Sequence, residues 1–164
     1  MKKVHLLNLG NPRRVKENLS GILGHPELEK IESEIVANTV ALYRLSRRFL
    51  LFALKQSPPN WRQRVSRLYY AAYNVSRAVR LFVSGEYSSD VKDHQRFDRL
   101  PDDFPSKDKY ANQLAVLRED RNMCDYDHTC RSTDLVLGIT QSTSLVIEFL
   151  DDAKSYLTAK GLKL

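Results

Sequence analysis

Two side chains suited to acid–base and phosphate chemistry lie seven residues apart, near the end of a helix predicted over residues 107–126. The apolar stripe of that helix continues, by the same steps of three and four residues, to Arg121, Cys124 and His128. Because each residue turns an α-helix by about 100°, seven residues return to within about 20° of the start. Arg121 and His128 are therefore predicted to share one face if the helix continues to residue 128.

The chemistry of this pair suits the cleavage of RNA. Histidine titrates near neutral pH, so His128 can take a proton from a 2′-hydroxyl group or return one to the leaving oxygen. Arginine can hold the phosphate and stabilise the charge that develops on it. Asn122 adds a polar group beside them, and no metal ion or other cofactor is required. The alternative is structural, with Arg121 in an ion pair of the bundle and His128 on the surface or at a helix cap.

Cys124 and His128 also permit two other kinds of site, which the sequence favours less. Their four-residue spacing can supply half of a zinc site on a helix. The chain has no second pair of cysteines, so the remaining ligands would have to include a carboxylate or the distant His94 or His25. A catalytic role for Cys124 lacks the glycine-rich turn that would bind an oxyanion. The sequence therefore predicts no metal site.

Aromatic and histidine side chains elsewhere permit both a functional and a structural interpretation. Tyr69, Tyr70 and Tyr73 can stack on the bases of a single-stranded nucleic acid. Their spacing spreads them over more than one side of a helix, which favours packing inside the bundle for some of them. His94, next to Asp93 in a polar segment, is interpreted as a solvated loop residue or a helix cap.

The charge distribution favours a polyanionic partner. The 164 residues carry a formal net charge of +6, and no acidic residue occurs between Glu34 and Glu86. Arginine suits phosphate because its planar guanidinium can donate two parallel hydrogen bonds. Four arginines of this stretch are therefore predicted to bind RNA, namely Arg62, Arg67, Arg77 and Arg80. The alternative is a solvated helix surface whose charge is balanced by acidic residues elsewhere.

The sequence predicts neither export nor a membrane partner. The apolar start of the chain is interrupted by Asn8, Gly10 and Pro12, unlike a signal peptide. The longest purely apolar run, residues 49–54, is far too short to span a bilayer. The two cysteines do not make a disulfide framework and are predicted to be free thiols. We therefore predict a cytoplasmic protein.

The first half of the chain contains the pattern of two long helices. Apolar residues recur at steps of three and four from Glu27 until the segment Ser57-Pro58-Pro59. The same spacing begins again after Asn60, a residue that favours the N-cap, and continues until Gly85. A short connection between two long helices makes them antiparallel neighbours.

The second half of the chain predicts two more helices. Residues 86–106 are polar and contain two prolines, so they are predicted to form a connecting loop with at most one turn of helix. The helix over residues 107–126 follows this loop. A fourth helix is predicted to start near Ser132 or Thr133, and no segment alternates with a period of two.

These patterns predict an all-α fold, an antiparallel bundle of four to five helices formed by residues 27–164. Residues 1–26 are predicted to be an N-terminal extension with at most one short helix. The length is that of one domain with a sizeable core.

Three segments make the chain similar to proteins of the HEPN family. Residues 67–74 resemble the second helix of HEPN domains. Residues 121–128 resemble the family signature, in which an arginine is followed by a polar residue such as asparagine, four to six residues and then a histidine. Residues 93–97, with Leu100-Pro101 after them, resemble the histidine-containing connection of several members. The resemblance covers residues 27–160.

The resemblance implies a helical bundle that forms a homodimer and cleaves RNA without a metal ion, leaving a cyclic phosphate. By position, Arg121 would bind and stabilise the scissile phosphate and His128 would act as acid and base. Asn122 would orient the substrate, and signature residues of both protomers would meet in one cleft. Many members are toxins of toxin–antitoxin pairs, often with a small nucleotidyltransferase as the antitoxin partner.

Two features depart from the pattern of the active toxins of the family. Asp125-Tyr126 resembles relatives without the catalytic histidine, in which the arginine serves structure or binding alone. Cys130 stands where toxins silenced by adenylylation carry a tyrosine. From the resemblance and the chemistry of Arg121 and His128, the predicted function is a metal-independent endoribonuclease of the HEPN type. The alternative is a non-catalytic module that binds RNA, a nucleotide or a protein and is partnered with a nucleotidyltransferase.

Overall fold

The computed structural model describes residues 10–88, 94 and 96–164, and within them the chain is all-helical. The predicted fold class is therefore confirmed, with five α-helices and no strand among these residues. Two 3₁₀ turns whose bounds lie within the described residues accompany the helices. In chain order the elements are α2 (Pro12–Asn18), α3 (His25–Leu54), η1 (Pro58–Asn60), α4 (Trp61–Ser84), α5 (Lys107–Tyr126), η3 (Ser132–Asp134) and α6 (Gly138–Ala159).

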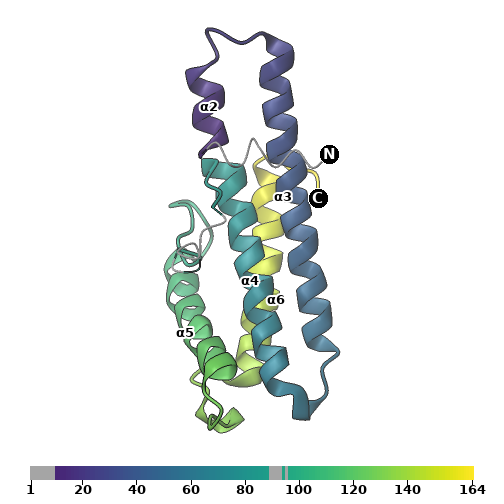
Figure 1. Cartoon of the computed structure of the whole chain (residues 1–164), viewed down its shortest axis with the longest axis vertical. Coiled ribbons are helices and arrows are strands. Elements are labelled where there is room, and N and C mark those ends of the chain that lie inside the picture. Colours follow the sequence, from purple (N-terminus) through teal and green to yellow (C-terminus); the bar gives the residue numbers. More distant parts are fainter. Residues whose placement is uncertain (1–9, 89–93, 95) are drawn as a thin grey trace.

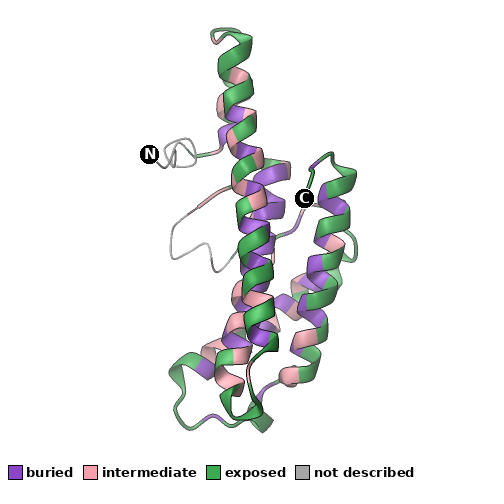
Figure 2. Cartoon of the chain, turned by 90° about the vertical axis from the view of Figure 1, so that its right-hand side faces the viewer, coloured by how far each residue is buried: buried purple, intermediate pink, exposed green. Residues whose placement is uncertain are grey.

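Four long helices form the bundle, and α4 lies at its centre (Figure 1). Helices α3 and α5 run in one direction, and α4 and α6 run in the other (Figure 1). Helix α4 packs along α3, α5 and α6, whereas α5 and α6 touch each other much less. The first turns of α3 extend beyond the bundle and are mostly exposed (Figure 2). Helix α4 therefore carries side chains for every packing layer of the fold.

The sequence of α4 explains this central place. Small residues such as Ala71, Ala72 and Ser76 are fully buried and allow neighbouring helices to approach closely. The Ser46 hydroxyl of α3 donates a hydrogen bond of 2.7 Å to the Ala71 carbonyl, which ties α3 to α4 inside the core. Tyr69 is only 1% exposed. Its burial supports the packing interpretation for this tyrosine.

Helix ends agree with the predictions in three places and differ in one. Helix α3 ends at Leu54, shortly before the predicted stop at Ser57-Pro58-Pro59, α4 stops before Gly85, and α5 has the predicted bounds. The predicted start of the last helix near Ser132 is wrong, because residues 132–134 form only a 3₁₀ turn and α6 begins at Gly138. The delay has a physical cause. The buried Asp120 carboxylate of α5 accepts hydrogen bonds from the amides of Val136 and Leu137, at 2.8 and 3.0 Å, before α6 starts.

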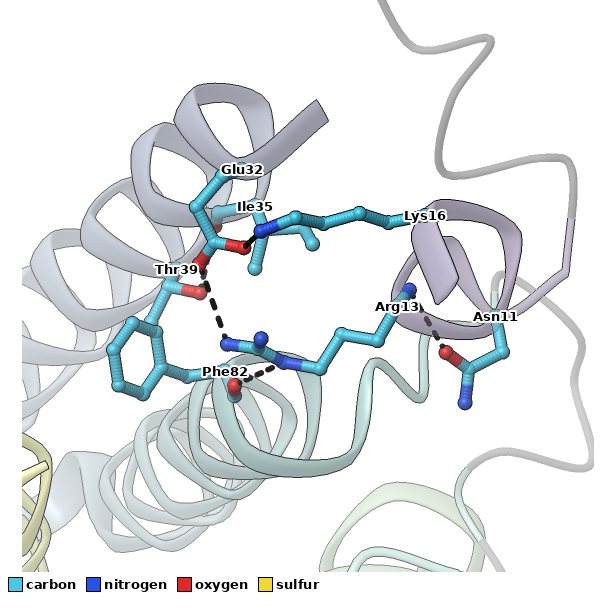
Figure 3. Close-up of polar contacts among 7 residues, drawn as sticks. All are labelled: Asn11, Arg13, Lys16, Glu32, Ile35, Thr39 and Phe82. Carbon is cyan, nitrogen blue, oxygen red and sulfur yellow. Dashed lines mark hydrogen bonds and ion pairs between the residues drawn. The ribbon is translucent and has the colours of Figure 1, made fainter. Parts of the chain in front are cut away.

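The segment predicted as an N-terminal extension packs against the bundle through α2 (Figure 3). Arg13 donates from Nε to the Phe82 carbonyl of α4 at 2.7 Å and lies 3.5 Å from the Glu32 carboxylate of α3. Lys16 forms a second ion pair with Glu32 at 2.8 Å. Asn11 caps α2 by accepting hydrogen bonds from the amides of residues 13 and 14. Helix α2 is thus docked on both α3 and α4.

The connection between α4 and α5 is anchored by apolar side chains. Phe97, Leu100 and Phe104 are all buried, and the Ser76 hydroxyl donates a hydrogen bond of 2.5 Å to the Phe97 carbonyl. Asp93 and Gln95, which contribute to the family resemblance, lie outside the described residues. No helix among the described residues is both long enough and apolar enough to cross a membrane.

Candidate functional site

An open cleft with a volume of about 820 Å³ lies where α4, α5 and the connection between them meet. Its volume falls within the ~300–1,000 Å³ of typical small-molecule sites. Polar, charged and aromatic side chains line it, namely Tyr69, Tyr70, His94, Asp98, Arg118, Glu119, Arg121, Asn122 and Tyr126. Arg121 and Asn122, two of the three predicted catalytic residues, therefore lie in one cleft.

Polar partners hold the Arg121 guanidinium in place. Its Nε lies 2.8 Å from Oδ2 of Asp125, one helical turn further along α5, in a charge contact whose angle is not that of a hydrogen bond. The terminal nitrogens of the guanidinium donate hydrogen bonds, from Nη2 to the Tyr70 hydroxyl at 3.1 Å and from Nη1 to the Asn122 side-chain carbonyl at 3.2 Å. Burial, the largest single effect, acts to lower the pKa of Arg121, but the Asp125 carboxylate together with Tyr70 and Tyr126 outweighs it and the pKa is raised. The side chain is thus a fixed cation.

Three aromatic rings surround the same guanidinium. The rings of Tyr69, Tyr70 and Tyr126 have their centroids 5.4, 5.6 and 5.4 Å from the Cζ of Arg121. These distances are within the range of cation–π attraction, which adds to the Coulomb attraction of the carboxylate. With 15% of the side chain exposed, Arg121 reaches the cleft but has little freedom to move.

His94 is the histidine that shares this cleft with Arg121. Its Nδ1 lies 2.8 Å from the Tyr69 hydroxyl, in a hydrogen bond, and its ring stacks on Tyr73 with 4.2 Å between centroids. Burial raises the pKa of Tyr69, so its phenol stays protonated at neutral pH. His94, interpreted from the sequence as a solvated loop residue or a helix cap, is thus held by two tyrosines of α4. Its side chain is half-buried.

His128 lies outside the cleft of the single chain. Helix α5 ends at Tyr126, and Asp127 has extended backbone angles of φ −99° and ψ 104°. The condition for a shared helical face with Arg121, a helix continuing to residue 128, is therefore not met. The Asp127 carboxylate accepts hydrogen bonds from the Thr129 hydroxyl and amide, which lowers the pKa of Asp127 and stabilises the turn. His128 is exposed in this turn.

Arg62, predicted to bind RNA, binds the protein itself. Its guanidinium donates to the backbone carbonyls of Cys124 and Asp127, both at 2.7 Å, and of Cys130 at 2.6 Å. These carbonyls belong to the end of α5 and the turn that carries His128. Arg62 therefore takes the place of a C-terminal cap for α5.

Replacing Arg62 with alanine is expected to lower the free energy of unfolding by about 2–3 kcal/mol. Three charge-assisted hydrogen bonds are lost and the half-buried carbonyls are left without this donor. Urea unfolding followed by circular dichroism measures the change. Arg44, an exposed arginine of α3, provides the matched control, and equal stability of the Arg62→Ala and Arg44→Ala variants would contradict the capping role.

The other three predicted RNA-binding arginines lie in different places. Arg67 stacks over Phe49 and Phe52 and lines a hollow of about 400 Å³ that also contains Tyr70 and Asp125. It therefore lies next to the cleft. Arg77 donates to the Ser88 carbonyl at 2.8 Å and contacts two tyrosine rings. Arg80 is 4% exposed and lines a different hollow. Only Arg67 borders the site of Arg121.

The two cysteines belong to a small apolar cluster. Cys124 and Cys130 are free thiols, as predicted, and are buried with Val65 and Leu135. Burial raises the pKa of Cys124 to about 12 and raises that of Cys130. A protonated thiol is a poor nucleophile, so the structure gives no support to a catalytic cysteine. Among the described residues, no group of three or more His, Cys, Asp or Glu side chains is placed to hold a metal ion.

The cleft also contains residues that were not predicted. Arg118 precedes Arg121 by three residues on α5, and this spacing places both on one helix face. The signal was therefore present in the sequence. Asp98 comes from the connection between α4 and α5, and no periodic pattern there indicates which side chains turn toward the cleft.

Comparisons of the chain with family models, curated proteins and solved structures found no match. The chemistry of the cleft therefore carries the functional interpretation.

Proposed function

We propose that this protein is a metal-independent endoribonuclease whose reaction takes place in the Arg121 cleft. The observation that carries the proposal is that a fixed, partly buried arginine, a second arginine and a histidine line one open cleft. Arg121 and Arg118 supply positive charge for a phosphate, and His94 supplies a group able to exchange a proton near neutral pH. Tyr70 and Tyr126 offer exposed or half-buried rings on which a base can stack.

The proposed reaction is an attack by a ribose 2′-hydroxyl on the neighbouring phosphorus. A histidine takes the hydroxyl proton, the new bond from the 2′-oxygen to phosphorus forms, and the bond to the 5′-oxygen breaks. The leaving 5′-oxygen receives a proton, and the products are a 2′,3′-cyclic phosphate end and a 5′-hydroxyl end. Arg121 stabilises the charge that develops on the phosphoryl oxygens. Asn122 would orient the substrate through its contact with that guanidinium.

A homodimer would bring a second histidine to the same phosphate. His128 is exposed at the end of α5, on a turn secured by Arg62, and so is available to a second copy. Exposed apolar side chains at the end of α3 support such a pairing, since Leu51 and Phe52 are 52% and 50% exposed. Phe52 adjoins Arg67, which borders the site. In this arrangement His128 of one copy would complete the cleft of the other.

A non-catalytic binding module is the second candidate, and one contact favours it. Asp125 already pairs with Arg121, and Asp98 and Glu119 place two more carboxylates around the cleft. These acids reduce the attraction for a polyanion. Such a module would bind RNA, a nucleotide or a protein partner, such as a nucleotidyltransferase antitoxin, without cutting RNA.

The test is incubation of the purified protein with total RNA in EDTA, followed by analysis of the cut ends. Wild-type protein is expected to leave 2′,3′-cyclic phosphate ends. The His94→Ala variant and the His128→Ala variant are each expected to lose activity. Mixing inactive Arg121→Ala and His128→Ala proteins distinguishes the two histidines. If His128 acts across the dimer, about a quarter of the activity returns, because half of the randomly exchanged dimers are mixed and each has one intact site.

If His94 acts within its own chain and His128 takes no part, His94→Ala abolishes cleavage and His128→Ala protein cleaves without being mixed with Arg121→Ala protein. Folded wild-type protein that binds RNA and leaves it uncut would rule out the ribonuclease and favour the binding module.

A further inference from the structure

A second hollow lies on the other side of the connection between α4 and α5. It has a volume of about 410 Å³ and is bounded by the start of α2, the end of α4 and residues 96–101. It shares no described lining residue with the Arg121 cleft. The hollow is therefore a separate site, and it does not depend on the proposed ribonuclease activity.

Arginine dominates the lining of this hollow. Among its described lining residues the basic side chains are Arg14, Arg80, Arg96 and Arg99, and the acidic one is Glu86. Arg80 is 4% exposed, whereas the other three arginines are exposed. The three exposed guanidinium groups around one concave surface favour a positive potential there, since low-dielectric walls concentrate the field. This arrangement favours an anionic ligand over a neutral or cationic one.

One wall of the hollow exists only because the N-terminal segment is docked. Asn11 donates from its side-chain amide to the Ser84 carbonyl at 2.6 Å, at the end of α4. Gly85 follows with φ +67°, and a Cβ atom there would lie 2.2 Å from Asn11 Oδ1 and 2.9 Å from Arg13 Cβ. Glycine is thus required both for the left-handed turn and for the close approach. The wall that carries Arg14 is built by this contact.

The segment that forms another wall of the hollow also borders the Arg121 cleft, with different residues. Phe97 is fully buried and its carbonyl is held by Ser76, which fixes the chain at this point. On either side of Phe97, His94 and Asp98 line the cleft, whereas Arg96 and Arg99 line the hollow. One anchored segment therefore presents different side chains to two sites.

We propose that this hollow binds an oligophosphate group, a chain of two or three phosphates. Each of the three exposed guanidinium groups can donate two parallel hydrogen bonds to a phosphate, and several arginines suit a ligand with several charges. The volume is that of a small-molecule site and far exceeds what one inorganic ion requires. The group can belong to a free nucleoside triphosphate or to the 5′ end of an RNA.

Titration calorimetry with sodium tripolyphosphate tests the site. Wild-type protein is expected to bind one equivalent, more weakly at higher salt because surface charges are screened. The Arg96→Gln/Arg99→Gln variant removes two exposed side chains and is expected to bind at least about tenfold more weakly. The matched control Arg44→Gln/Arg47→Gln removes the same charge from α3 and is expected to bind like wild type.

Two further variants separate this site from the others. Arg121→Ala is expected to keep tripolyphosphate binding even if it changes RNA cleavage. Gly85→Ala changes no charge, but it is expected to displace the wall at Asn11 and to weaken binding in a protein that circular dichroism shows to be folded. Failure of wild-type protein to bind tripolyphosphate, or equal binding by the two double variants, would overturn the proposal.

Two probes then distinguish the source of the phosphates. ATP and a short RNA with a 5′-triphosphate are titrated into wild-type protein and into the Arg96→Gln/Arg99→Gln variant. Tight binding of either probe, lost in the variant, supports the site and identifies its ligand class. If tripolyphosphate binds and neither probe does, the site does not accept the oligophosphate of a nucleotide or of an RNA end, and the proposal is overturned.

Discussion

Replacing Arg121 with alanine is expected to slow RNA cleavage by about 10²-fold or more. A cationic donor aimed at the charge that develops in the transition state typically contributes a factor of this size. Its position is set by Asp125, Tyr70 and Asn122, so no other side chain of the cleft takes its place. Single-turnover cleavage of a labelled RNA in EDTA gives the rate, and separate binding measurements show whether affinity changes as well.

Two variants make the test of Arg121 specific. Arg121→Lys keeps the charge but loses the planar fork, so it is expected to restore only part of the rate. Arg44→Ala removes one exposed arginine of α3 and is expected to cleave like wild type. The loss of the Asp125 ion pair and of the hydrogen bond to Tyr70 should cost about 1–2 kcal/mol of stability, which leaves a folded protein. Wild-type cleavage by Arg121→Ala would place the reaction outside this cleft.

Replacing Asp120 with alanine is expected to lower the free energy of unfolding by about 2–4 kcal/mol. The Asp120 side chain is fully buried, and its two oxygens accept the amides of Val136 and Leu137. Alanine leaves both donors without this acceptor and also leaves a small cavity, and each effect is costly in a core. Urea unfolding is expected to show a lower midpoint with an unchanged slope.

The neighbouring acid provides the control for Asp120. Glu119 is exposed and pairs with its neighbour Arg118 at the surface, so Glu119→Ala is expected to change stability by less than about 0.5 kcal/mol. Asp120→Asn retains one acceptor oxygen and is expected to lie between wild type and Asp120→Ala. Equal stability of the Glu119→Ala and Asp120→Ala variants would show that the carboxylate does not hold the start of α6. Asp120 directly precedes Arg121, so the variant also tests how firmly the cleft residue is supported.

Local patterns in the sequence determined most of the fold. The spacing of apolar residues predicted α3, α4 and α5, because a helix that packs on one side must repeat its apolar residues every three or four positions. Proline at Pro58 and glycine at Gly85 marked helix ends through their own backbone preferences. The start of α6 was misplaced because Asp120, 16 residues before Val136, accepts the amides there. The local spacing of apolar residues does not predict a hydrogen bond between residues so far apart in the sequence.

The candidate site was determined only in part by the sequence. The spacing of α5 placed Arg121 and Asn122 together, since neighbours on a helix depend on geometry within one turn. Which histidine shares their cleft was decided by tertiary structure, because the α4–α5 connection returns His94 to Tyr69, 25 residues away in the sequence.

The roles of the arginines were likewise decided by tertiary structure. The sequence determined that positive charge is concentrated between Glu34 and Glu86, and it predicted one shared role for four arginines. In the folded chain Arg62 binds backbone carbonyls, Arg67 borders the cleft and Arg80 lies in a separate arginine-rich hollow. A charge is a property of the residue itself, whereas its partner depends on which distant segment packs against it.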